Sequence, residues 1–124
     1  ILGAEEWRFD HQNVADLFLA RWLDREVGRF SGDCDVVEKH AAWIGQRDIG
    51  GYLVGQAKGR HCLTQVAASI CAAHGETFER GLGELMYKGL PMGAERRALV
   101  DAARTAVARW KKASPCVKAL IKSL

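Results

Sequence analysis

Apolar residues recur at every third or fourth position along most of the chain, which is the period of an amphipathic helix. The clearest run lies at 13–30, where Asn13 and Asp16 supply an N-terminal cap and Ser31-Gly32 ends the pattern. The apolar positions that recur at this spacing are Val14, Leu17, Phe18, Trp22, Leu23, Val27 and Phe30.

The same period predicts four further helices and a short last one. They lie at about 33–48, 60–74, 77–89 and 94–113, and Ser114-Pro115 has the cap and first-turn chemistry that begins the last. Alternating strand patterns are nearly absent and no internal repeat is visible. The sequence therefore predicts an all-α fold, with residues 1–124 forming one compact bundle of five to six helices.

A glycine-punctuated segment at 50–59 ends near two basic residues, Lys58 and Arg60. A phosphate-binding loop would need Gly-Lys-Ser/Thr at the start of a helix that follows a strand, and neither is present. Small residues that let two helices pack closely, or a hinge, explain this segment better. We therefore expect no nucleotide site and no cofactor.

The composition is that of a soluble globular domain, with 48% hydrophobic and 27% charged residues in 124. No apolar run approaches the roughly 20 residues of a membrane helix, so we expect no membrane span. No export signal is visible. Because the chain begins at Ile1 rather than at methionine, we expect it to have been processed or cut from a longer protein.

The net charge of +3 conceals an asymmetry between the two parts of the chain. Residues 1–50 contain six Arg or Lys and ten Asp or Glu, a balance of −4, whereas residues 51–124 contain twelve and five, a balance of +7. Such a division indicates either an interaction surface of one sign or two parts that fold against each other.

Four cysteines, Cys34, Cys62, Cys71 and Cys116, are widely spaced and form no Cys-x-x-Cys motif. They are compatible with two disulfides or with free buried thiols. Cys62 and Cys71 lie nine residues apart on one predicted helix, about 13 Å along its axis, so they can neither bond to each other nor share a metal ion. If bridges exist, Cys34 and Cys116 must each reach this helix. A secreted or periplasmic location would follow from bridged cysteines and a cytoplasmic one from free thiols.

The predicted helix at 94–113 carries Arg97, Arg104 and Lys111 at heptad spacing, on the side away from Leu99 and Trp110. Such a basic ridge is either a solvated helix face or a surface that binds an acidic partner protein. No aromatic residues interleave with it to stack on bases, so we place nucleic acid last among the candidate ligands.

The stretch CAAHGETFERG at 71–81 ends an apolar helix and brings Glu76-Thr77 before Phe78. It resembles the catalytic-glutamate segment of the lysozyme and transglycosylase superfamily, which implies a cell-wall glycosidase with Glu76 as general acid and peptidoglycan as its anionic substrate. The downstream Gly-Leu-Met-Gln of transglycosylases is replaced here by Glu84-Leu85-Met86-Tyr87. We prefer the simpler interpretation, in which Gly75 ends one helix, Thr77 caps the next and Glu76 faces water.

The order of Cys34, Tyr52-Leu53-Val54-Gly55, Cys62 and Pro115-Cys116 is similar to that of a family of small helical, disulfide-bonded bacterial immunity proteins. That resemblance implies an inhibitor of cell-wall amidases delivered by type VI secretion. The spacing after Cys62 is longer than in that family, and Cys71 has no counterpart there.

No motif in the chain brings two catalytic roles together at a suitable spacing. We therefore expect a non-enzymatic binding module of the inhibitor or immunity type, which recognises another protein through a charged face that includes Arg97, Arg104 and Lys111. The alternative is the cell-wall glycosidase that uses Glu76. Neither hypothesis requires a metal ion.

Overall fold

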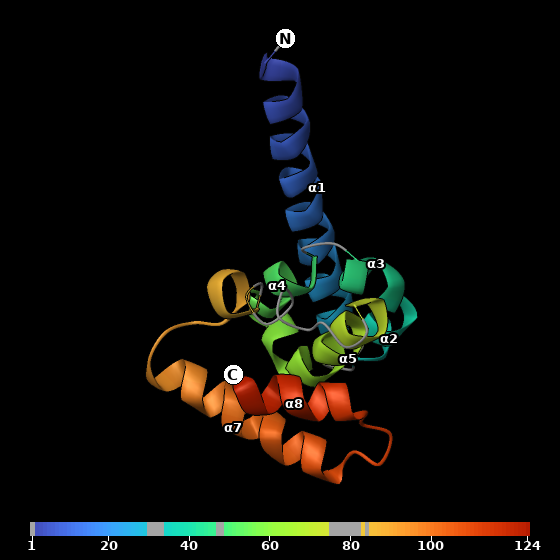
Figure 1. Ribbon diagram of the computed structural model, residues 1–124, viewed down its shortest axis with the longest axis vertical. Coiled ribbons are helices and arrows are strands. Elements are labelled where there is room, and N and C mark those ends of the chain that lie inside the picture. The colour runs from blue at the N-terminus through green and yellow to red at the C-terminus, as the bar shows by residue number, and fades with distance from the viewer. Residues whose placement is uncertain (1, 30–33, 47–48, 75–82, 84) are drawn as a thin grey trace.

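The structure is a computed structural model that describes residues 2–29, 34–46, 49–74, 83 and 85–124; for 2–13, 46, 74, 87 and 88 it describes the backbone alone. Every element in these ranges is helical, which confirms the predicted all-α class (Figure 1). The elements are α1 (Leu2–Arg29), α2 (Asp35–Lys39), α3 (Ala41–Gln46), α4 (Ile49–Val54), η1 (Gly59–Cys62), α5 (Leu63–His74), η2 (Leu85–Gly89), α7 (Ala94–Arg109) and α8 (Pro115–Ser123). None of these helices is long and apolar enough to span a lipid bilayer.

Helix α5 lies at the centre of the molecule and packs against α2, α3, α4, α7 and α8. Its side chains Val66, Ala67 and Ile70 are completely buried. The α7–α8 hairpin covers one end of this core, and the N-terminal half of α1 extends away from the opposite end (Figure 1).

Helix α3 approaches α5 closely at Gly45, which is buried. A Cβ atom at this position would lie 2.8 Å from the Cβ atom of Ala73 and still closer to the carbonyl oxygen of Ser69. Similarly, a Cβ atom on Gly50 would lie 2.9 Å from Cγ1 of Val66. Gly50, at the start of the 50–59 segment, therefore allows close helix packing, as one of the two interpretations of this segment predicts.

Two disulfides join the central segment formed by η1 and α5 to its neighbours. Cys34, just before α2, is bonded to Cys62, and Cys71 of α5 is bonded to Cys116 of α8, with Cα–Cα distances of 5.6 and 5.9 Å. Cys34 and Cys116 thus each reach the central helical segment, as the spacing of Cys62 and Cys71 requires. No cysteine is free.

The loop between α4 and η1 is held on α1 by one carboxylate. Asp24 Oδ1 accepts hydrogen bonds from the backbone N–H groups of Lys58 and Gly59, each at 2.8 Å. Gly59 is required there because a Cβ atom would collide with the carbonyl group and side chain of Leu53. This contact fixes the 50–59 segment against the C-terminal half of α1.

Several predicted helix ends were wrong. Helix α1 begins at Leu2, so Asn13 is not its N-terminal cap. The segment predicted as one helix at 33–48 is broken at His40, whose φ and ψ are −111° and 23°. Helix α7 ends at Arg109 because Trp110 adopts an extended conformation. The start of α8 is confirmed: Ser114 Oγ accepts a hydrogen bond from the backbone N–H of Val117 at 3.3 Å, and Pro115 occupies the first turn.

The apolar positions of α1 do not form one buried face. Leu23 and Val27 are buried together with Ala20, whereas Val14, Phe18 and Trp22 are exposed by 50, 63 and 37%. The cause is that α1 carries two apolar stripes, and the other helices cover only the one that contains Leu23 and Val27.

Candidate functional site

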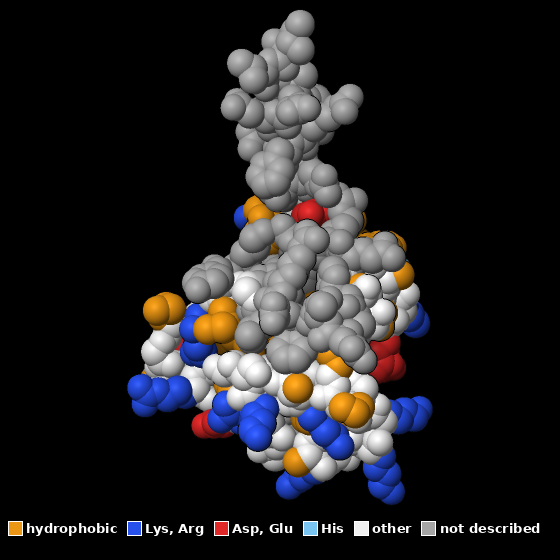
Figure 2. Space-filling model, viewed as in Figure 1, with side chains coloured by type: hydrophobic (Ala, Val, Ile, Leu, Met, Phe, Trp, Pro, Cys, Tyr) orange, Lys and Arg blue, Asp and Glu red, His pale blue; other side chains and the backbone are white. Residues whose placement is uncertain are grey.

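The α7–α8 hairpin concentrates positive charge. Residues 94–124 contain eight Arg or Lys against two acidic residues, Glu95 and Asp101, a net charge of +6. Seven of the eight basic residues are exposed: Arg97, Arg104, Arg109, Lys111, Lys112, Lys118 and Lys122. Figure 2 shows Lys and Arg side chains standing out around the end of the molecule that α7 and α8 form. We call these seven residues the basic face.

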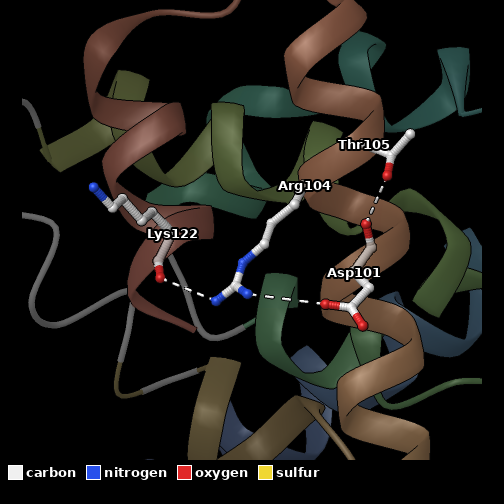
Figure 3. Close-up of polar contacts among 4 residues, drawn as sticks. All are labelled: Asp101, Arg104, Thr105 and Lys122. Atoms are coloured by element: carbon white, nitrogen blue, oxygen red, sulfur yellow. Dashed lines mark hydrogen bonds and ion pairs between the residues drawn. The ribbon is translucent and has the colours of Figure 1, made fainter.

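Arg104 connects the two helices of the hairpin (Figure 3). Its Nη2 donates to the backbone carbonyl of Lys122, near the end of α8, at 3.2 Å, and its Nη1 lies 3.9 Å from Asp101 Oδ1. Both side chains of the ion pair are exposed, so this pair contributes at most about 1 kcal/mol to stability. The contact with Lys122 uses a carbonyl that the helix end leaves without a helical partner. Arg104 thus holds α8 in place while it remains accessible to a partner.

The other two residues of the predicted ridge are free to bind. Arg97 lies in the first turn of α7 and is exposed, and within the described chain it has no ion pair. Lys111 is also exposed, but it lies in the turn after α7, since the helix ends two residues earlier. The prediction that all three residues form a ridge on one helix was therefore wrong. Arg97 and Arg104 share α7, where they lie seven residues and about 10.5 Å apart along the helix axis. Lys111 extends the basic face into the turn that follows.

Arg96, the eighth basic residue, stabilises the approach to α7 instead of contributing to the basic face. Its guanidinium group donates to the backbone carbonyls of Pro91 at 2.8 Å, of Met86 at 2.7 Å and of Leu90 at 3.5 Å. Carbonyl groups at a helix end attract cations, and Arg96 fixes the π-helical element η2 to the start of α7. The sequence shows no difference between Arg96 and its neighbour Arg97, so this division of roles could not be predicted.

A mainly apolar pocket of about 570 Å³ opens beside the basic face, between α5 and the turn that leads into α8. The Cys71–Cys116 disulfide forms part of its wall, and Lys112 brings a positive charge to it. Its other lining residues are Ala68, Ala72, Trp110, Ser114, Pro115 and Val117. The sequence indicated a core position for Trp110, and the pocket was therefore not predicted. The available signal was that two lysines, Lys111 and Lys112, directly follow this tryptophan.

The other candidate sites are the cysteines, a metal site and Glu76. All four cysteines are bonded, so none is a thiolate nucleophile. In the part of the chain that the structure describes, no three His, Cys, Asp or Glu side chains come together in a way that could hold a metal ion. Glu76 lies in 75–82, outside the described residues, so its predicted role as a general acid remains a prediction.

Comparison with known proteins identifies no relative: no family model matches this chain, and neither a curated protein nor a solved structure matches it. The resemblances to immunity proteins and to lysozymes therefore remain predictions from short motifs. A function has to be argued from the basic face and its surroundings.

Proposed function

We propose that this protein is a small helical binding module of the inhibitor or immunity type, which recognises an acidic surface of a partner protein through the basic face. The observation that carries the proposal is the segregation of charge: 94–124 has a net charge of +6, and seven of its basic side chains are exposed. Complementary potentials of this kind accelerate association and select partners.

The basic face is held on a rigid support, which reduces the entropy lost on binding. The Cys71–Cys116 disulfide fixes α8 to α5, and Arg104 fixes the end of α8 to α7. Val100, Ala103 and Val107 of α7 are buried in the core. The exposed lysines and arginines therefore project from a backbone that needs no rearrangement to present them.

The pocket beside Trp110 and Lys112 adds an apolar anchor point to this electrostatic surface. Interfaces commonly concentrate their binding energy in a few apolar or aromatic groups that fill such pockets, with charged residues around them. A partner that offers carboxylates around one apolar side chain would satisfy both parts of the surface.

The disulfides bear on the cellular compartment in which such a module binds its partner. Disulfides persist in oxidising compartments and are rare in the cytosol. The two bridges, Cys34–Cys62 and Cys71–Cys116, fit a secreted or periplasmic location. We therefore propose that the partner is met outside the cytosol.

The test compares two double variants with the same change in net charge. Arg97→Glu with Lys111→Glu alters the basic face, whereas Lys39→Glu with Lys58→Glu alters exposed lysines elsewhere. A partner retained by the immobilised wild-type protein from an extract of the source cells is purified, and its affinity for each variant is measured by isothermal titration calorimetry.

We expect the basic-face variant to bind this partner at least about tenfold more weakly and the control variant to bind within about twofold of wild type, because charge complementarity acts over short, screened distances. Equal affinities of the two variants would refute the proposal. Clearing of peptidoglycan by the purified protein, abolished by Glu76→Gln, would favour the glycosidase instead.

A further inference from the structure

Helix α1 exposes a stripe of large apolar side chains that the other described elements cover only in part. Val14, Phe18 and Trp22 are exposed by 50, 63 and 37%, and their spacing of four residues places them on one side of the helix. Isolated apolar residues are common on protein surfaces, but a continuous row of three large ones marks an interaction site.

The same side of α1 is basic. The exposed residues of 14–29 are Val14, Ala15, Phe18, Arg21, Trp22, Arg25 and Arg29, and none of them is acidic. Of the three acidic residues in this segment, Asp16 is buried and Asp24 accepts two backbone hydrogen bonds from the 58–59 loop. The third, Glu26, is 20% exposed and lies 3.9 Å from Arg29, so Arg21 and Arg25 carry most of the positive charge of this side. Phenylalanine, tryptophan and arginine together are typical of protein interfaces and require a partner that brings both apolar groups and carboxylates.

The surface around this stripe is already ordered. The ring of Trp22 lies 5.6 Å from that of His40 and 6.4 Å from that of Trp43, between ring centroids, and His40 and Trp43 stack at 4.3 Å. On the other side of Phe18 lies a hollow of about 420 Å³, lined by Phe18, Arg21, Asp24, Arg25 and Gln56. A helix lying on α1 would contact Trp22 on one side and this hollow on the other.

The N-terminal part of α1 has complementary properties. Its backbone at 2–13 is helical and extends beyond the rest of the molecule as a single helix (Figure 1). An isolated helical segment of about 12 residues is only marginally stable in water, so it gains stability from any surface on which it packs. The sequence of this segment is acidic, with Glu5, Glu6 and Asp10 against Arg8.

We propose that α1 is a self-association surface and that its occupant is α1 of a second copy of this chain, in antiparallel orientation. An antiparallel pair with twofold symmetry places the acidic segment 2–13 of each copy along the basic stripe 14–29 of the other, so the complementary contact occurs twice. A parallel pair would place like charges together. The twofold axis then passes close to Val14, and Phe18 and Trp22 are buried against the N-terminal half of α1 of the other copy.

This inference is independent of the basic face, because α7 and α8 lie at the opposite end of the molecule from the start of α1 (Figure 1). A dimer of this kind presents two copies of the basic face, pointing away from each other. The two surfaces can therefore be tested separately.

The experiment uses two charge-reversed versions of the whole chain. In the first, Glu5, Glu6 and Asp10 are replaced by lysine, and in the second, Arg21, Arg25 and Arg29 are replaced by glutamate. The three arginines of the second are exposed, so the fold, monitored by circular dichroism, is expected to remain. Sedimentation velocity up to roughly 100 µM covers the range of weak, transient dimers.

We expect the wild-type chain to dimerise, each reversed chain alone to be at least about tenfold weaker in self-association, and an equimolar mixture of the two to dimerise again, because only the mixed pair restores opposite charges along both contacts. Phe18→Asp should weaken the wild-type dimer to a similar extent, whereas Arg97→Glu with Lys111→Glu should leave it unchanged. A wild-type chain that stays monomeric overturns the inference, and so does a dimer that the reversed charges do not weaken. A monomeric chain that binds a polyglutamate peptide through Arg21 and Arg25 would assign the stripe to a different acidic partner, which also overturns it.

Discussion

Gly45 offers a direct test of the packing between α3 and α5. The substitution Gly45→Ala adds one methyl group at a place where it would lie 2.8 Å from Cβ of Ala73 and 2.9 Å from the carbonyl carbon of Ser69. Ordinary contacts begin near 3.4 Å, so the two helices would have to separate by 0.6 Å or more. Because the nearest atoms belong to the backbone of α5, a change of side-chain rotamer does not relieve the clash.

Two opposing terms set the size of the effect. Inserting a methyl group into a fully packed site costs typically about 1–3 kcal/mol. Alanine also favours a helix interior over glycine by about 1 kcal/mol. Since the obstacle is backbone, the cost lies in the upper part of its range, and we expect a net loss of about 1–2 kcal/mol in the free energy of unfolding.

Urea denaturation followed by circular dichroism measures this loss, and two other glycines serve as controls. Gly28→Ala meets only the flexible side chain of Lys58, and Gly83→Ala meets no atom of the described residues within 4 Å. Both should therefore be neutral or stabilising, by up to about 1 kcal/mol. If Gly45→Ala is as stable as the controls, α3 and α5 do not approach as closely as described.

Three further substitutions are measured by the same method. Replacing both Cys71 and Cys116 by alanine should cost about 4 kcal/mol, because the bridge closes a loop of 45 residues, and a loss below about 1 kcal/mol would contradict its assigned role. Asp24→Ala should cost about 2 kcal/mol because two backbone N–H groups lose a charged acceptor, and Asp24→Asn, which keeps a carbonyl acceptor, should cost less. Ser114→Ala removes the cap of α8 and should cost about 1 kcal/mol, whereas Ser123→Ala, on the exposed end of the same helix, should be neutral.

The features that depend on local chemistry could be predicted from the sequence. The helical period identified the fold class, and Ser114 with Pro115 identified the start of α8, because capping and a fixed φ act within one turn. The spacing of Cys62 and Cys71 excluded a bond between them, since helix geometry alone sets that distance.

The features that depend on tertiary contacts could not be predicted. Two pairings of the four cysteines satisfied the helix geometry, and only the placement of α2 and α8 selects the observed one. His40 interrupts a helical pattern without a proline or glycine to signal it. On α1, the periods of Leu23 with Val27 and of Phe18 with Trp22 are equally helical, and the sequence does not show which the other helices cover.

The basic face could be predicted only in part, because it too depends on tertiary contacts. Arg97, Arg104 and Lys111 were identified as basic residues at a regular spacing, but their different situations follow from where α7 ends and where α8 returns. A break in the helix at Trp110, unmarked in the sequence, moved Lys111 from the helix into the turn and placed it beside the pocket residue Lys112.

The two disulfides join cysteines that are consecutive in the chain, so the loops 34–62 and 71–116 follow one another without overlap. If the N-terminus of the chain enters an oxidising compartment first, Cys34 and Cys62 meet the oxidant before Cys71 and Cys116. Oxidation in the order of delivery therefore yields the native pairing directly, with no step of thiol–disulfide exchange to correct it. This topology suits a protein whose maturation proceeds without a disulfide isomerase.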